Sequence, residues 1–162
     1  MMPQTITEGT LTIDSFTAEN HILSNFWERS PFVAPYIWWP DRGEFEWATT
    51  EHFYQAHKAI TIVEAESVRD MNTPGGSKRR GRKVRLQDGW NTNKDLIVMR
   101  IAPRHKFGPC TEAGKFLMGT GEAYLIEGNK HGDTYWGTVD GQGRNYLGRL
   151  LMVRRLELNL GL

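Results

Sequence analysis

The chain is organised around the stretch Thr49-Thr50-Glu51-His52-Phe53-Tyr54-Gln55-Ala56-His57-Lys58. A threonine is a good N-cap, and Glu51 then falls in the first turn, where a carboxylate favours the positive end of a helix. At about 100° per residue, Glu51, Gln55 and Lys58 share one face. Apolar residues from Phe53 to Ile60 form another face, which predicts a helix between a core and a cleft. A solvated surface helix has a similar pattern, so the stretch alone leaves both interpretations open.

Length and composition favour one domain over residues 1–162, with residues 1–10 expected to be flexible. The net charge of +1 gives no global signal for an acidic partner. The single cysteine, Cys110, excludes an internal disulfide and fits a reducing compartment, and a structural role suits it better than a nucleophilic one. No signal peptide and no 18-residue apolar run is present, so we expect a cytoplasmic protein without a membrane partner.

Short β-prone runs surround the opening stretch. Alternation predicts strands over residues 11–16 and 123–127. Runs over residues 32–39 and 44–47 flank Pro40-Asp41-Arg42-Gly43, a turn signal that predicts a hairpin. A polar-aromatic turn over residues 23–27 places the amide of Asn25 where it can face a ligand.

Helical patterns fill most of the remaining chain. They are expected over residues 63–71, 91–106, 111–118 and 145–160. Pro103 should kink or end the second of these, Thr111 is a candidate N-cap of the third, and Asn145 should be the N-cap of the last, a leucine-rich core helix. The run 72–76 predicts the end of the helix 63–71, and Ser77 is then expected to cap a short basic segment. The long glycine-rich loop over residues 128–144 is typical of a functional segment.

Positive charge is concentrated in one place. Residues 78–85 carry six positive charges, so the rest of the chain sums to −5 against a total of +1. Such a run is often a solvated face, but it also suits a phosphate-rich ligand or a nucleic-acid backbone.

Several kinds of site have no support in the sequence. His52 and His57 lie five positions apart, on different sides of a helix, and no zinc motif is present, so we expect no metal. Phosphate-binding loops, dinucleotide fingerprints and nucleophile elbows are also missing, and no cofactor is expected.

The remaining carboxylates, lysine and tryptophans suit attack at a sugar anomeric carbon. Cleavage of an N-glycosidic bond builds positive charge on the ribose, which a carboxylate stabilises while another group protonates the leaving base. Glu51 is the first candidate for the carboxylate and Asp133 the second. Lys58 has three open roles: proton donor, phosphate anchor, or amine toward an opened ribose. Trp90 and Trp136 are candidates for stacking the base, although a tryptophan taken alone is more often a core residue than a platform for a ligand.

The order of these motifs resembles the YbiA-like, or NADAR, superfamily. The resemblance rests on Leu23-Ser24-Asn25-Phe26, Glu51 to Lys58, Gly81-Arg82, Trp90 with Lys94 and Met99, Lys106-Phe107, Asp133-x-x-Trp136-Gly137, and Asn145-x-Leu147-Gly148-x-Leu150-Leu151-Met152. It runs from about residue 14 to residue 156. The chain departs from the pattern at Thr138-Val139, which precede Asp140, and in a longer hairpin around Trp38 to Arg42.

The resemblance implies an α+β, mainly α, fold: one compact domain with a small β component. It implies hydrolysis of a ribosyl N-glycosidic bond, and the basic run favours ADP-ribose on a nucleobase, chiefly guanine in DNA or RNA, as substrate. The alternatives are ribosylamino-pyrimidine phosphates of riboflavin biosynthesis, or binding of ADP-ribose or NAD without catalysis. Catalytic roles carry over to Glu51, Lys58 and Asp133. Pocket positions carry over to Asn25, Phe26, Gln55, Arg82, Trp90, Trp136, Gly137 and Asn145.

Overall fold

The computed structural model describes residues 11–162, so the expected flexibility of residues 1–10 lies outside the described residues. The strands are β1 (Thr12–Ile13), β2 (Phe32–Pro35), β3 (Glu44–Trp47) and β4 (Tyr124–Leu125). The α-helices are α1 (Thr50–Ala56), α2 (Ile62–Arg69), α3 (Pro74–Gly81), α4 (Asp95–Lys106), α5 (Glu112–Gly119) and α6 (Tyr146–Asn159). Two 3-10 segments, Ala18–Leu23 and Pro40–Arg42, and a π-helical turn, Trp90–Lys94, complete the described elements. The α+β, mainly α, fold class is confirmed, and the domain boundaries of 1–162 stay a prediction.

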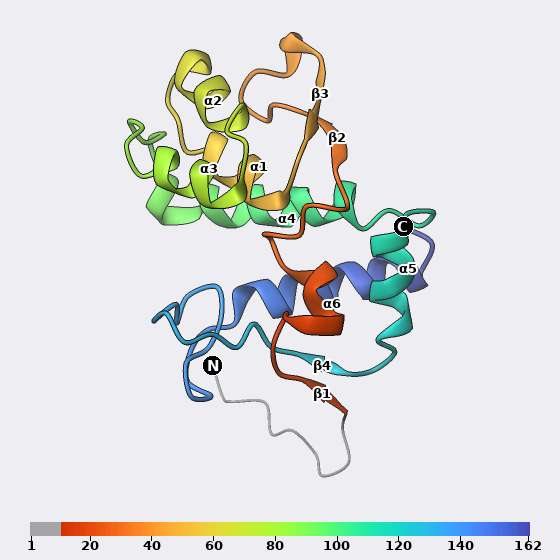
Figure 1. Cartoon of the computed structure of the whole chain (residues 1–162). Helices are drawn as coiled ribbons and strands as arrows, with labels where there is room; N and C mark the ends of the chain where they lie inside the picture. The colour runs from red at the N-terminus through yellow and green to blue at the C-terminus, as the bar shows by residue number, and fades with distance from the viewer. Residues whose placement is uncertain (1–10) are drawn as a thin grey trace.

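Helix α4 lies in the middle of the molecule. Helices α1 to α3 and the β2–β3 hairpin lie on one side of it, and α5, α6 and the β1–β4 pair lie on the other (Figure 1). Its inward side chains Val98, Met99 and Ala102 are almost completely buried. Because α4 packs against both α1 and α6, it fixes the two helices that carry the opening stretch and the C-terminal core.

Strands β1, β2 and β4 are shorter than the sequence pattern predicts, whereas β3 coincides with the predicted run 44–47. β1 pairs in parallel with β4 over only two residues, although the pattern predicts strands over 11–16 and 123–127. The hairpin is confirmed: β2 and β3 pair antiparallel, with Phe32 opposite Trp47 and Pro35 opposite Glu44. Gly43 has φ of 84°, a conformation that favours glycine.

Threonine side chains cap four of the helices. Thr49 accepts a hydrogen bond from the backbone N–H of His52, and Thr111 accepts one from Gly114, as the sequence predicts. Thr61 and Thr73 cap α2 and α3 in the same way. The prediction for α3 is therefore wrong. Pro74 opens the helix instead of stopping one, because proline suits the first helical position, and Ser77 is buried inside it.

Three further local predictions need correction. Asn145 precedes α6 but has φ of 51° and makes no capping hydrogen bond with its side chain. Helix α4 ends at Lys106 as predicted, but it begins at Asp95 instead of residue 91, after the π-helical turn, and Pro103 does not end it. Ile60 follows the end of α1 and is 40% exposed, so it does not extend the buried face of that helix.

Candidate active site

A cavity of about 1300 Å³ lies where four parts of the chain meet. Most of its walls come from α1, from α3, from the segment 15–26 and from the segment 127–136, and Met99 of α4 and Leu147 of α6 complete them. Eight of the eleven predicted site residues line it: Asn25, Phe26, Glu51, Gln55, Lys58, Arg82, Asp133 and Trp136. Its volume exceeds the roughly 300–1,000 Å³ of ordinary small-molecule sites, so a nucleotide-sized ligand has room in it.

Glu51 is a buried carboxyl group on the cavity wall, only 5% exposed. Its Oε1 accepts a hydrogen bond of 2.7 Å from Nε2 of Gln55, one turn further along α1. Burial raises the pKa of Glu51, while Gln55 and the nearby ammonium groups of Lys78 and Lys58 oppose that shift. The Asp133 carboxylate adds to the upward shift, and the pKa stays above the ordinary glutamate value, so the ionised form of Glu51 depends on this one donor and two cations.

The contact between α1 and α3 depends on Gly81. A Cβ atom at this position would overlap the side-chain amide oxygen of Gln55. Glycine thus lets the C-terminal end of α3 approach the pair formed by Gln55 and Glu51. This close approach also brings the next residue, Arg82, to the cavity wall.

Lys58 lies just after α1, because the helix ends at Ala56. Its Nζ lies 5.3 Å from the centroid of the Tyr54 ring. Burial lowers the pKa of Lys58, and the positive charges of Arg82 and Lys78 lower it further, while Glu51 opposes the shift. This environment increases the fraction of neutral amine, which is the nucleophilic form.

The segment 127–136 is held together by side chains. Asp133 Oδ1 accepts hydrogen bonds from the backbone N–H groups of Tyr135, at 3.0 Å, and Trp136, at 2.8 Å. Asn129 Oδ1 accepts one from the backbone N–H of Asp133, and its Nδ2 donates to the Asp133 carbonyl oxygen. The Asp133 side chain therefore orders the loop that presents Trp136 to the cavity.

Glu127 is a cavity residue that the sequence reasoning missed. It follows β4, and its Oε2 is buried with no hydrogen-bond partner among residues 11–162. Burial raises the pKa of Glu127 to about 7, and the carboxylate of Asp133 adds to the shift. In the sequence, the only indication that Glu127 belongs to the site is its position at the end of the predicted strand 123–127, six residues before Asp133.

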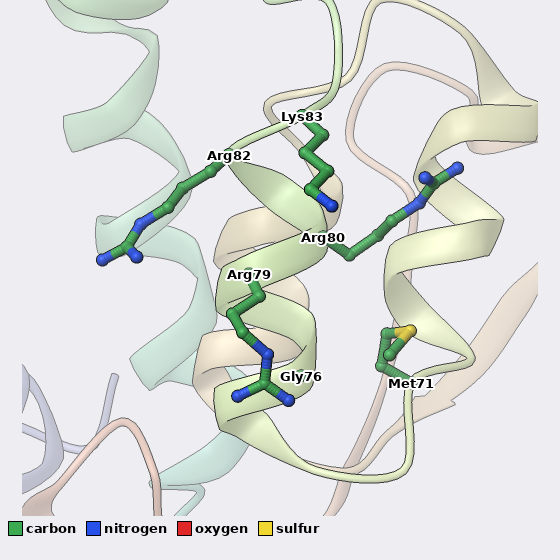
Figure 2. Close-up of a pocket in the computed structure, with 6 residues that line it drawn as sticks. All are labelled: Met71, Gly76, Arg79, Arg80, Arg82 and Lys83. Atoms are coloured by element: carbon green, nitrogen blue, oxygen red, sulfur yellow. The ribbon is translucent and has the colours of Figure 1, made fainter.

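Helix α3 divides the basic run between two hollows. Lys78, Arg79 and Arg82 line the large cavity. A second hollow of about 380 Å³ is lined by Met71, Gly76, Arg79, Arg80, Arg82 and Lys83. Figure 2 shows Arg82 extending to one side of α3 and Arg80 to the other, where its Nε donates to Ser67 Oγ of α2. Only part of the run therefore faces the large cavity.

Three predicted pocket residues lie elsewhere. Trp90 is 4% exposed and packs behind Tyr54, with ring centroids 5.3 Å apart, so it supports a cavity residue instead of lining the wall. Gly137 is buried where a Cβ would overlap the carbonyl oxygen of Glu127. The side chain of Asn145 accepts a hydrogen bond from the Glu127 backbone N–H and donates one to the Leu125 carbonyl. Gly137 and Asn145 thus fix the backbone around Glu127.

Tyr54 is a second cavity residue that was missed. It follows Glu51 by three positions, a spacing that places both on one helical face. Its ring packs edge-on against Trp136, with centroids 5.4 Å apart. The two aromatic side chains form one apolar part of the cavity wall.

The histidines of the opening stretch have structural partners. His52 lies between the Thr49 hydroxyl and the Met71 carbonyl, and Nδ1 of His57 lies 2.7 Å from the Phe53 carbonyl oxygen. Within residues 11–162, no group of three or more histidine, cysteine, aspartate or glutamate side chains is arranged to hold a metal ion. Over the same residues, no helix has the length and apolar character needed to cross a membrane.

Known proteins resemble this chain over most of its length. Residues 14–159 match the model of the NADAR domain. The N-glycosidase YbiA of Escherichia coli (strain K12) is 36% identical over 124 residues, which are 74% of this chain and 76% of the relative. The chloroplastic riboflavin biosynthesis protein PYRR of Zea mays is 34% identical over 127 residues, 70% of this chain and 20% of that longer protein.

A solved structure extends the likeness to the fold. The NMR structure of the E. coli protein YbiA superimposes with a TM-score of 0.76 at 31% identity, covering 96% of this chain and 89% of that one. The match in sequence and in fold spans nearly all the described residues. The chain belongs to the NADAR domain family.

Proposed function

We propose that this protein hydrolyses the N-glycosidic bond of a phosphorylated riboside, with Glu51 as the central carboxylate. The observation that carries the proposal is the buried Glu51 on the wall of a large cavity that also contains cations of α3. The name N-glycosidase, borne by the related E. coli protein, supports the same reaction class.

The chemistry of the bond explains why a buried carboxylate is useful. As the C1′–N bond breaks, positive charge develops on the ribose, and a carboxylate in a poorly solvated site stabilises that charge strongly. The same carboxylate can accept a proton from the attacking water. Gln55 holds the Glu51 side chain through the 2.7 Å hydrogen bond, so its orientation is set before substrate binds.

Lys58 and Asp133 complete the proposed machinery in different ways. Lys58 lines the cavity beside Glu51, and its lowered pKa suits an amine that attacks a ring-opened ribose, as well as a proton donor or phosphate anchor. Asp133 orders the loop through two backbone amides and adds negative charge near Glu51 and Glu127. We assign Asp133 to positioning and electrostatics ahead of direct contact with the reacting atoms.

ADP-ribose attached to a nucleobase, such as guanine in DNA or RNA, is the proposed substrate. Lys78, Arg79 and Arg82 place three cations on one wall, more than a single monophosphate needs. The second candidate is a ribosylamino-pyrimidine phosphate, favoured because two relatives, from Zea mays and Vibrio vulnificus, are named riboflavin biosynthesis proteins. Binding of ADP-ribose or NAD without turnover is the non-enzymatic alternative.

The test compares the substrates directly. Purified protein is incubated with an ADP-ribosylated oligonucleotide and, separately, with the pyrimidine riboside phosphate, and the released sugar is measured by mass spectrometry. We expect faster release of ADP-ribose. Faster turnover of the pyrimidine riboside would reverse the ranking, and inertness toward both with tight ADP-ribose binding would refute the enzymatic proposal.

Two variants test the roles of residues. Glu51→Gln should reduce kcat by about 10²–10⁴-fold while ADP-ribose still binds, whereas Glu46→Gln, on an exposed position of β3, should behave as wild type. Arg82→Gln should raise KM more than Arg80→Gln, since only Arg82 lines the large cavity. If the two arginine variants raise KM equally, the specific phosphate contact proposed for Arg82 is contradicted.

The proposed reaction uses no metal and no cofactor, and takes place in the cytoplasm. The exposed free thiol of Cys110 suits a reducing compartment. Turnover should therefore survive incubation with EDTA, and loss of activity restored by added Zn²⁺ or Mg²⁺ would replace this mechanism with a metal-assisted one.

A further inference from the structure

Three of the described residues that line the cavity carry a carboxyl group: Glu51, Asp133 and Glu127. Glu127 has no role in the reaction proposed above. It comes from the segment after β4, whereas Glu51 comes from α1, and both line the same cavity. The Asn145 amide fixes the backbone at Glu127, with 2.9 Å from the Glu127 N–H to Asn145 Oδ1. A Cβ at Gly137 would overlap the Glu127 carbonyl oxygen, so the loop packs directly against this residue.

The surroundings of Glu127 favour its neutral form. Its Oε2 is buried and has no partner among the described residues, so no donor stabilises a negative charge there. Burial raises its pKa to about 7, and Asp133 contributes in the same direction. The other charged and titratable side chains of the cavity have no resolved effect on it: His21, Glu51, Tyr54, Lys58, Lys78, Arg79, Arg82, Lys130 and His131.

Burial and Asp133 raise the pKa of Glu51 as well, but Glu51 also has partners that Glu127 lacks. It accepts a hydrogen bond from Gln55, and the positive charges of Lys78 and Lys58 favour its ionised form. Among the described residues, the charge that acts on Glu127 is that of Asp133, which has the same sign. Two carboxyl groups in one site, one beside a donor and two cations and the other without a partner for its Oε2, are suited to the base and acid roles of one reaction.

We propose that Glu127 is the proton donor to the departing base in the N-glycosidic cleavage assigned to this cavity. The C1′–N bond breaks with its electron pair going to nitrogen, and the Glu127 carboxyl proton moves to that nitrogen. The water oxygen forms a bond to C1′ while its proton passes to the Glu51 carboxylate. Exchange with solvent then returns the proton to Glu127 and deprotonates Glu51. This inference rests on the proposed function.

The first experiment measures the protonation of Glu127 without using activity. Carbon-13 NMR of glutamate side-chain carboxyl groups is followed from pH 4 to pH 9 in wild type, and the resonance absent from Glu127→Gln identifies the residue. Titration near pH 7 supports the proton-donor role. Titration near the ordinary glutamate value of about 4.5 overturns it, whether or not a substrate has been found.

The second experiment measures turnover. Glu127→Gln should lower kcat by about 10²–10⁴-fold and abolish the decline in kcat/KM as pH rises through 7, because that decline reports loss of the acid. Glu127→Asp should keep the decline and recover part of the rate. Glu122→Gln, an exposed position just before β4, is the matched control and should match wild type.

The outcomes distinguish failure of the glycosidase function from failure of the proton-donor role of Glu127. If wild type is active and Glu127→Gln keeps both its rate and its alkaline decline, Glu127 is not the donor although the glycosidase function stands. If wild type releases no sugar from any substrate tested, the proposed function fails, and the carbon-13 titration decides only the protonation state of Glu127. Circular dichroism of each variant checks that a loss of rate is not a loss of fold, and Glu127→Asp covers the case in which the glutamine variant does not fold.

Discussion

Lys106 offers a test of how the buried interior controls stability. It lies at the end of α4, is 2% exposed, and donates a hydrogen bond of 2.7 Å from Nζ to the carbonyl oxygen of Ser24. Burial lowers its pKa from 10.5 to about 7. The bond spans 82 residues of sequence and holds the turn that carries Asn25 and Phe26 to the cavity.

The perturbation is Lys106→Met, which keeps an unbranched side chain but removes the titrating amine. Between pH 7 and 10.5 the unfolded chain binds a proton that the folded lysine does not, so this residue makes the wild type more stable as pH rises. Each pH unit in that window adds about 1.4 kcal/mol. Because the folded lysine is still half protonated at pH 7, the free energy of unfolding of the wild type should rise relative to that of the variant by roughly 2 kcal/mol from pH 7 to pH 9.

Urea unfolding followed by tryptophan fluorescence measures this difference at pH 6, 7, 8 and 9. Below pH 7 the difference between the two proteins should be flat, since Lys106 is protonated in both the folded and unfolded wild type. Lys115→Met, an exposed position of α5, is the control and should show no pH-dependent difference. A constant offset for Lys106→Met from pH 6 to pH 9 would refute the reasoning, because it would mean that burial does not lower this pKa.

Two further predictions concern the cavity. Gly81→Ala should displace Gln55 and remove the donor to Glu51, so the acidic limb of the kcat/KM profile should move to higher pH and kcat should fall about tenfold. Gly119→Ala, where a Cβ meets open space, is the control, and an unchanged profile in both variants would contradict the prediction. Asp133→Ala should lose about 1–3 kcal/mol of stability through two unpaired backbone amides, whereas Asp133→Asn should lose less because its amide oxygen still accepts. Equal unfolding midpoints in urea for the two Asp133 variants would show that these hydrogen bonds do not order the loop.

Local sequence rules predicted the elements whose signals lie within a few residues. Thr49 and Thr111 cap their helices because a threonine oxygen reaches a backbone N–H three residues on. The turn from Pro40 to Gly43 forms the hairpin because its residues fit the required backbone angles. The same rules misjudged α3, since Pro74 and the glycines after it also fit a helix once Thr73 caps it.

The sequence by itself determined the family, the fold class, most helices and the opening stretch that supplies Glu51 to the cavity. Only the tertiary structure decided that Trp90 supports Tyr54 from behind, that Asn145 holds Glu127 instead of capping α6, and that Glu127 faces the cavity. The physical reason is that burial and charge at a side chain come from segments distant in sequence. A glutamate at the end of a strand has an ordinary pKa until the packed fold removes its water and places Asp133 nearby, which raises that pKa to about 7.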